Sequence, residues 1–424
     1  MGINVKPKKS ATSNYAWVVY IADILLFVAV GGFFNTVALY MDPVLKEFPN
    51  ISRSAYAGTI TLCSISSAAM NILYGKVNSK ISVRRIVQIG GVCVIISIFV
   101  YSIASALWMF YLAAFIFGAS LAMCAETTAA VLVSEWFARR IGTLTSIVLT
   151  ASALSASIFG PLIGGWIDTF GWRQSFRYSL ILMGSLIVIA AILIRSKPAD
   201  MGLKPMWSDK EADVLMGNDQ LVTNEEKIFS FKDTLKSFNF WCIIIFFFII
   251  SGLIYSVVSS LPILASDLGY NNIQSSVVNS CVFIGNAATL IPFGILYDKI
   301  SSKKALLINV VIFLICLPIL IMPNTPYVLL CAAAVLAGIC YNAITLPMVV
   351  IVTEFFGSEA VNNIVGCGIG SMYLGMSIIC PVFQKTYDIS GSYTSSFIAY
   401  IPIMIACILF LVFGLKKRNE VPTN

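Results

Sequence analysis

Two carboxylic acids, Asp23 and Glu126, lie inside long apolar segments of a chain that contains no histidine. Without histidine, the chain has no imidazole general base, no Ser-His-Asp relay and no histidine-ligated metal site. If the apolar segments cross a membrane, each acid costs about 2.5–3.5 kcal/mol to insert and usually faces a cavity or a partner. The two acids therefore predict uptake and release of a proton, with a single hydrogen bond between helices as the alternative for each.

Other reactive groups do not form a recognisable catalytic set. The sequence has no GxxxxGK[ST] pattern, so an ATP-driven pump is disfavoured, and no cluster of catalytic residues interrupts the apolar segments. The 11 cysteines never occur as C-x-x-C and fall mostly in apolar segments, where a cysteine is usually a small buried side chain. We expect no enzyme activity, no cofactor and no metal site.

Composition places these residues in a bilayer. The chain is 58% hydrophobic and 11% charged with a mean hydropathy of +0.90, whereas a soluble domain carries about 25% charged residues. Twelve apolar runs are long enough to cross about 30 Å of hydrocarbon as helices. They fall at about 15–40, 55–75, 86–106, 108–135, 143–166, 176–194, 239–265, 276–297, 304–323, 326–355, 362–384 and 394–415. The runs are continuous rather than alternating, which favours helices over a β-barrel.

The basic residues predict which ends of the spans face the cytoplasm. With a cytoplasmic N-terminus, about 22 Lys and Arg lie on the inner side and about 5 lie outside, which is a strong positive-inside bias. The outer basic residues are Lys46, Arg53, Arg173, Arg177 and Lys385. The first run is too long for a signal peptide and reads as a retained span. We expect a plasma-membrane protein with both termini in the cytoplasm. In this topology Glu126 lies near mid-membrane, whereas Asp23 lies in the cytoplasmic part of span 1.

The spans form two sets of six that repeat one another. A polar stretch divides them, which predicts a six-helix bundle at 1–194, a cytoplasmic linker at 195–238 and a second bundle at 239–424. The loop GKVNSKISVRR at 75–85 returns at 294–304 as GILYDKISSKK. Further matches in the same order and at nearly the same offset are Ser134–Phe137 with Thr353–Phe356, Asn50–Ser54 with Asn272–Ser276, and Pro161, Asp168 and Gly171 with Pro381, Asp388 and Gly391. Such a repeat predicts a duplicated six-span unit whose halves are parallel.

The repeated loop resembles the signature of the major facilitator superfamily. Closer resemblance is to the oxalate/formate antiporter and monocarboxylate porter branch. It is carried by Trp136-Phe137 with Arg139-Arg140 and Gly142, by Gly171–Phe176, by Pro198–Pro205, and by Tyr387-Asp388 with Gly391–Tyr393. The resemblance implies an all-α membrane protein of twelve transmembrane helices in two six-helix repeats. It also implies a monomer in the lipid bilayer that carries a small-molecule solute through one central site, without nucleic acid.

The chain departs from that branch at the positions expected to bind carboxylates. Span 8 has no Arg within Ile284–Phe293, and span 11 has no Lys before Lys385. Oxalate-like dianions would therefore lack the cationic partners that they need in these spans. The solute could be neutral, zwitterionic or cationic, or an anion that moves with a proton. The candidate substrate-binding or coupling residues are Glu126, Asp23, Asn35, Asn286, Tyr341 and Asn342. Of these, Glu126 is predicted to be the main one because it is the deepest carboxylate.

Small residues and charges suggest where the halves move against each other. Gly160, Pro161, Gly164 and Gly165 resemble the antiporter motif of drug/proton exchangers, although close helix packing would select the same residues. By analogy with the superfamily's packing, we predict two latches on the cytoplasmic side. One joins Asp298 to Arg139 or Arg140, and the other joins Glu359 to the group Lys80, Arg84 and Arg85. The alternative is that these charges only set the topology.

These features favour a secondary transporter of a small organic solute such as a monocarboxylate, operating as a symporter or antiporter with protons as a candidate coupling ion. Two alternatives remain open. One is a membrane sensor or receptor that keeps the fold but does not transport, and the other is a drug/proton antiporter.

Overall fold

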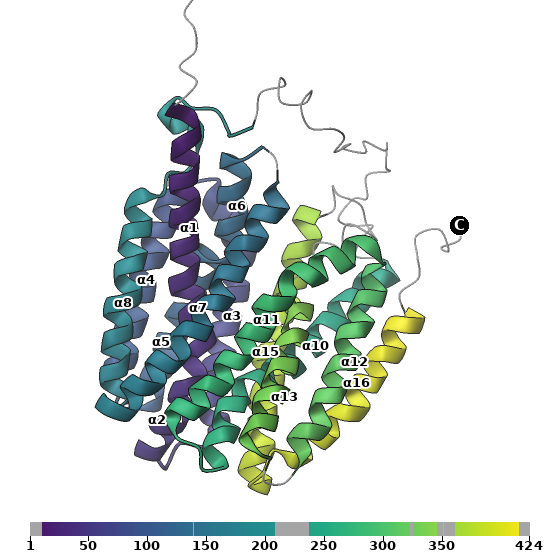
Figure 1. The fold of residues 1–424 in the computed structure, drawn as a ribbon. Helices are drawn as coiled ribbons and strands as arrows, with labels where there is room; N and C mark the ends of the chain where they lie inside the picture. The colour runs from purple at the N-terminus through teal and green to yellow at the C-terminus, as the bar shows by residue number, and fades with distance from the viewer. Residues whose placement is uncertain are drawn as a thin grey trace, which may run out of the picture.

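The protein is a bundle of long helices (Figure 1). The computed structural model describes residues 11–138, 140–207, 237–322, 325–345, 351 and 361–414. Within these ranges, twelve helical segments are long and apolar enough to cross a membrane. The predicted number and type of spans are therefore confirmed.

The first six spans are built from nine consecutive elements. They are α1 (Ala11–Thr36), η1 (Val37–Tyr40), α2 (Met41–Glu47), α3 (Arg53–Asn78), α4 (Val83–Ile103), α5 (Leu107–Cys124), α6 (Glu126–Trp136), α7 (Ile141–Phe170) and α8 (Trp172–Leu193). A short 3-10 turn, η2 (Pro198–Met201), follows. We call this set the N-half.

The second set of spans, the C-half, begins after residues outside the described part of the chain. Its described helices are α10 (Phe238–Asp267), α11 (Asn272–Lys299), α12 (Ser302–Ile321), α13 (Tyr327–Thr345), α15 (Val361–Ser390) and α16 (Thr394–Gly414). Helix starts agree with the repeat, since Arg53 of α3 and Asn272 of α11 are separated by the same interval as the two repeated loops. This register differs from the sequence match of Asn50–Ser54 with Asn272–Ser276, in which Asn50 rather than Arg53 stands opposite Asn272.

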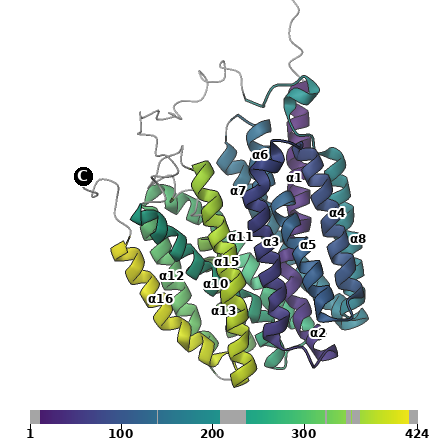
Figure 2. The same ribbon diagram turned by 180° about the vertical axis from the view of Figure 1, so that it is seen from behind.

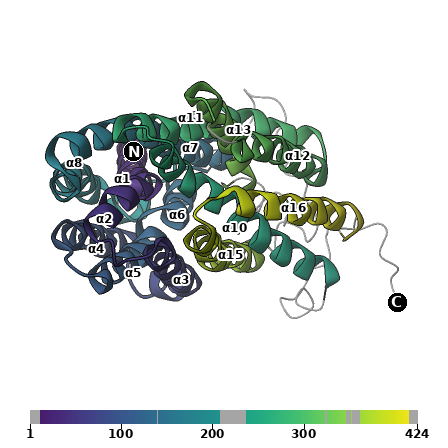
Figure 3. The ribbon, with the colours of Figure 1, turned by 90° about the horizontal axis from the view of Figure 1, so that it is seen from below.

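The two halves stand side by side and touch along two lines. Figures 1 and 2 show α1 beginning and α16 ending at one end of the bundle, which we call the inner end. The charge bias predicts that this end faces the cytoplasm. The opposite, outer end holds the connections at 48–52, 104–106 and 268–271. Seen from that end, α3 lies beside α15 and α7 lies beside α11 (Figure 3).

Repeated glycines let helices of one half approach closely. A Cβ atom on Gly118 of α5 would overlap the carbonyl oxygen of Cys63 in α3. A Cβ atom on Gly338 of α13 would overlap the carbonyl oxygen of Val282 in α11. The two contacts occupy corresponding positions of the repeat, so both halves use the same small-residue packing that brings membrane helices together.

The fourth span, Leu107–Trp136, is broken within its length at Ala125, which the sequence did not predict. Helix α5 ends at Cys124, Ala125 adopts φ −118° and ψ −128°, and α6 begins at Glu126. Neither Gly nor Pro stands at the break. Instead, the Thr128 hydroxyl donates a hydrogen bond to the carbonyl oxygen of Met123 at 2.7 Å and also pairs with the Tyr74 hydroxyl at 2.9 Å. The Thr128 hydroxyl thus supplies a partner for a backbone carbonyl at the break, as interrupted membrane helices require.

Candidate functional site

A cavity lies between the two halves, where α1, α5, α7, α11, α13 and α15 converge. Aromatic rings form much of its wall, from Phe27, Phe34, Phe283, Tyr341 and Tyr373. Its polar side chains are Asn35, Ser152 and Asn286, and the other lining residues are small or aliphatic. The cavity measures about 60 Å³, which is room for a few water molecules. No charged side chain lines it within the described part of the chain.

An amide network supports one wall of this cavity. The Asn286 side-chain nitrogen donates to the side-chain oxygen of Asn342 at 3.3 Å, and the Asn342 nitrogen donates to the Thr289 hydroxyl. Asn342 is fully buried behind Asn286. The Tyr341 ring packs edge-on against Phe283 with 5.9 Å between ring centroids. The structure therefore brings the predicted residues Asn286, Tyr341 and Asn342 together at one place.

Asn35 lies on the opposite wall, in α1. Its side chain lines the cavity, and its backbone carbonyl accepts a hydrogen bond from the side-chain nitrogen of Asn279 in α11 at 3.2 Å. This bond joins the two halves directly beside the cavity, so the position of Asn35 depends on how the halves meet.

Asp23 lies outside the cavity but close to it. It precedes Phe27 in α1 by about one helical turn, or roughly 5.4 Å, toward the inner end. The residue is 0% exposed, and neither carboxylate oxygen has a hydrogen-bond partner among the described residues. Its electrostatic neighbours are the phenols of Tyr20 and Tyr74. A charged group buried without a partner is costly, so this position is suited to an acid that exchanges a proton.

Glu126 begins α6 directly after the break, and the preceding residue, Ala125, lines the cavity. The first residues of a helix carry free N–H groups and favour a negative charge. The side chain of Glu126 lies outside the described part of the structure, so its role stays a prediction.

The residues predicted to latch the inner end are only partly described. Lys80 and Arg85 are exposed, and the backbone N–H of Arg84 donates to the Ser196 hydroxyl at 3.0 Å. The Arg140 guanidinium lies over the Trp207 ring, 6.0 Å from its centroid. Arg139, Glu359 and the side chain of Asp298 are outside the described residues. The two inner latches therefore stay predictions.

The glycines singled out in span 5 contact the other half unequally. A Cβ atom on Gly160 would lie 2.9 Å from the Ser280 hydroxyl of α11, and one on Gly164 would lie 2.8 Å from the Asn272 carbonyl oxygen. A Cβ atom on Gly165 would meet nothing within 4 Å. Pro161 lies inside α7 between these contacts. Gly160 and Gly164 thus face the seam between the halves, whereas Gly165 does not.

Polar contacts at the outer end were missed by the sequence reasoning. The Arg53 guanidinium of α3 pairs with Asp267 of α10 at 2.6 Å, and carboxylates from the ends of α7 and α15 bind the starts of α11 and α3. Two of these acids, Asp168 and Asp388, had been noticed only as a repeated pair. Their position at helix ends before Gly171 and Gly391 is the sequence signal from which these contacts could have been predicted.

A family model described as Major Facilitator Superfamily matches residues 22–278 and 248–424 of the chain. The chain belongs to the Major Facilitator Superfamily. The relatives that resemble this chain are named as transporters rather than enzymes.

Among named relatives, the oxalate:formate antiporter of Oxalobacter formigenes is 25% identical over 298 residues, covering 68% of this chain and 65% of that protein. Human monocarboxylate transporter 7 is 23% identical over 220 residues, covering 51% of this chain and 42% of that protein. The predicted resemblance to this branch is therefore confirmed. The chain spans less than half the length of the first curated relatives it matches, between 37% and 44%.

The fold also matches solved transporters of the superfamily. A point mutant of the nucleoside transporter NupG superposes with a TM-score of 0.73 at 14% identity, over 95% of this chain and 100% of that one. At this identity the likeness concerns the fold alone. It confirms the predicted architecture of two six-helix repeats.

Proposed function

We propose that this superfamily member carries a small monocarboxylate together with a proton, by alternating access of one central site. The observation that carries the proposal is the cavity between the halves, whose described lining has aromatic rings and amides but no charge. The amide of Asn286 can donate hydrogen bonds to a carboxyl oxygen, and the aromatic rings can pack against a short apolar tail.

The lack of a cation in the described cavity lining decides the form in which an acid would be carried. A carboxylate buried without a cation pays a large desolvation cost, and a dianion pays more. If a proton accompanies the carboxylate, the pair is neutral overall and this cost is largely removed. The same reasoning disfavours oxalate, although a named relative is an oxalate:formate antiporter.

Asp23 is the described residue best placed to hold the accompanying proton. It is buried, its oxygens have no described partner, and it lies one helical turn from Phe27 of the cavity wall. Glu126, beside the break in span 4, is the second candidate. We infer that one of these acids relays the accompanying proton to the solute and is then protonated again, so that the solute occupies the cavity as the neutral acid.

The proposal also covers the membrane location, the topology and the oligomeric state of the protein. The excess of basic residues at the inner end supports cytoplasmic termini in a plasma membrane. We further propose a monomer whose two bundles, 1–194 and 239–424, move about the linker at 195–238. Nothing in this mechanism needs a cofactor.

Uptake into proteoliposomes that contain a pH-sensitive dye tests the proposal. Lactate, formate and oxalate should be supplied separately at external pH 5.5 and 7.5. We expect saturable entry of lactate or formate, internal acidification during entry, and faster entry at pH 5.5 because the external proton concentration is higher. Oxalate should enter at least tenfold more slowly.

Three results would overturn the proposal. Faster entry of oxalate than of either monocarboxylate would show that the site accepts a dianion. Entry without acidification would remove the proton from the mechanism. Binding of lactate or formate, detected as a shift in thermal unfolding, without any flux would favour the sensor alternative.

A further inference from the structure

The outer end is held shut by carboxylates that cap helices of the opposite half. Asp388, near the end of α15, accepts hydrogen bonds from the backbone N–H groups of Arg53 and Ser54 at 3.1 Å each. Asp168, near the end of α7, accepts from the backbone N–H of Ile273 at 3.2 Å and from the Asn272 side chain at 2.5 Å. The first N–H groups of a helix have no partner in their own helix, and a carboxylate there also interacts favourably with the helix dipole.

These two caps are equivalent in the repeat. Asp168 and Asp388 are separated in the chain by almost the same interval as the starts of α3 and α11, which they cap. We call the contact of α3 with α10 and α15 the Arg53 seam, and the contact of α7 with α11 the Asp168 seam. Each seam therefore contains one cap of the same kind.

The Arg53 seam has an ion pair across the halves in addition to its cap. The Arg53 guanidinium donates two hydrogen bonds to Asp267 of α10, at 2.6 and 2.9 Å, and a third to the Tyr393 hydroxyl at 3.0 Å. It also lies over the Tyr387 ring, 3.8 Å from the centroid. The Arg53 and Asp267 side chains are only 16% and 23% exposed. A two-pronged, partly buried Arg–carboxylate pair is much stronger than an exposed one.

A second arginine ion pair at the outer end stays within one half. Arg173 of α8, a basic residue at the same end, pairs with Glu47 of α2, and both belong to the N-half. Their side chains are 37% and 42% exposed. This ion pair can persist when the halves separate, so it adds nothing to the closure of the Asp168 seam.

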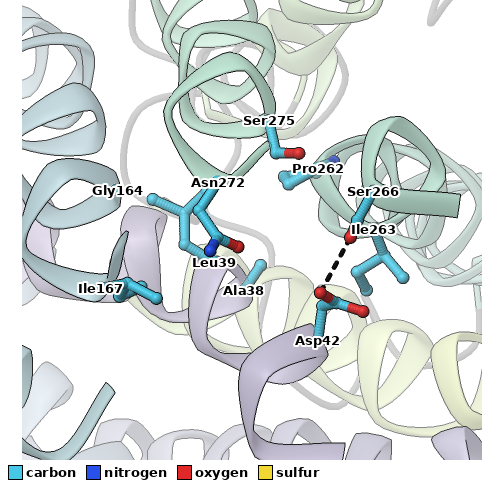
Figure 4. A pocket seen from close by; sticks show the side chains of 10 residues that line it. All are labelled: Ala38, Leu39, Asp42, Gly164, Ile167, Pro262, Ile263, Ser266, Asn272 and Ser275. Carbon is cyan, nitrogen blue, oxygen red and sulfur yellow. Dashed lines mark hydrogen bonds between the residues drawn. The ribbon is translucent and has the colours of Figure 1, made fainter. Parts of the chain in front are cut away.

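The Asp168 seam also contains a small gap. A gap of about 10 Å³ remains beside Gly164 and Asn272, and the Ser275 hydroxyl in its wall is buried without a partner among the described residues (Figure 4). The hydrogen bond that the Ser266 hydroxyl donates to Asp42 at 2.8 Å lies beside this gap and joins the halves. The Asp168 seam therefore has hydrogen bonds in which neither partner or only one is charged. The Arg53 seam has a complete ion pair as well.

We propose that Arg53 is the positioning residue that sets the balance between the closed and open outer end, and that this end opens first along the Asp168 seam. In this sequence, α11 separates from Asp168 while α3 remains fastened to α10 and α15. Release of Arg53 from Asp267 then completes the opening. The inference rests on alternating access of the halves and not on the identity of the solute or on proton coupling.

Hydrogen exchange measured by mass spectrometry on the full-length protein in lipid nanodiscs tests this order without any solute. In the unmodified protein, the first turn of α11 should exchange at least fivefold faster than the first turn of α3. In Arg53→Gln, exchange should rise at least tenfold in the first turn of α3 and also increase in α11. The matched control is Arg173→Gln, which breaks the pair within the N-half and should change either segment less than twofold.

Two further variants keep the test decisive if Arg53→Gln does not fold. Asp267→Asn breaks the same ion pair from the C-half and should reproduce the effect of Arg53→Gln. The double variant Arg53→Asp with Asp267→Arg should restore much of the protection, which a merely structural role would not do. Equal protection of both first turns in the unmodified protein would overturn the opening order. Equal effects of Arg53→Gln and Arg173→Gln would overturn the role of Arg53.

Discussion

Replacement of Gly164 by alanine should open the outer end. An alanine Cβ atom there would lie 2.5 Å from the Ser276 hydroxyl oxygen and 2.8 Å from the Asn272 carbonyl oxygen, whereas ordinary contact begins at 3.4 Å. Helix α11 would have to move away from α7 by about 0.6 Å to relieve the backbone contact, and overpacking of this kind costs about 1–3 kcal/mol. That cost applies only when the Asp168 seam is closed.

The size of the effect is set by the part of the free-energy change that differs between the closed and the open outer end. Alanine also gains about 0.8–1.0 kcal/mol of helix propensity over glycine, but α7 is helical in both states, so this gain leaves the balance unchanged. About 2 kcal/mol remains in favour of the open state, which is about a thirtyfold shift. The adjacent control, Gly165→Ala, meets nothing within 4 Å and should keep only the gain in propensity.

Hydrogen exchange in the first turn of α11 measures this shift, and thermal unfolding measures overall stability. We expect Gly164→Ala to raise the exchange rate of that turn by about thirtyfold if the open state is a small fraction of the unmodified protein. Gly165→Ala should leave exchange within twofold and raise the unfolding temperature slightly. If the two variants exchanged at the same rate, close packing at Gly164 would not hold the seam shut.

Three other changes test separate parts of the structure. Asp23→Asn should abolish acidification during lactate entry without lowering the unfolding temperature, since it removes an acid with no described hydrogen-bond partner; acidification equal to that of the unmodified protein would refute the role of Asp23. Asn286→Ala should raise KM for the carried solute about tenfold with a smaller change in kcat, because the cavity loses an amide and Asn342 loses a partner; an unchanged KM would place the solute elsewhere. Gly338→Ala should lower the free energy of unfolding by about 3 kcal/mol, measured by denaturation in detergent, because its Cβ atom would overlap a backbone carbonyl of α11. Gly370→Ala, which meets nothing within 4 Å, is the control for that variant.

The architecture was readable from the sequence because it depends on bulk properties. Twelve apolar segments of sufficient length are enough to specify twelve helices in a bilayer, and the nearly constant offset between the repeated loops and motifs indicates the duplication. The grouping of Asn286, Tyr341 and Asn342 could also be expected, since all three are polar residues within spans of the C-half. Their actual contacts required the structure.

The break at Ala125 could not be predicted from local sequence. Helix breaks usually coincide with Pro or Gly, and neither is present there. The bonds that accommodate it come from Thr128 and from Tyr74, which lies in a different span. The break therefore depends on how α3 packs against the fourth span, and a sequence pattern within that span does not contain this information.

The outer caps were missed for a related reason. Asp168 and Asp388 appeared in the sequence as a repeated pair, but the helix starts that they bind belong to the opposite half. Charge counting treated Arg53 as one of a few outer basic residues, and the sequence gives no sign that its partner is Asp267. Long-range pairing of this kind becomes visible only when the two halves are placed against each other.

The caps at the outer end have a consequence for the solvent. When the seams part, the N–H groups of Arg53, Ser54 and Ile273 and the carboxylates that bound them must all find new partners, and water is the one available. Opening is therefore a hydration reaction, and its equilibrium depends on water activity. An inert polymer too large to enter between the halves draws water out of that space and favours the closed state. External osmotic stress should accordingly slow entry of the solute even when its concentration gradient is unchanged.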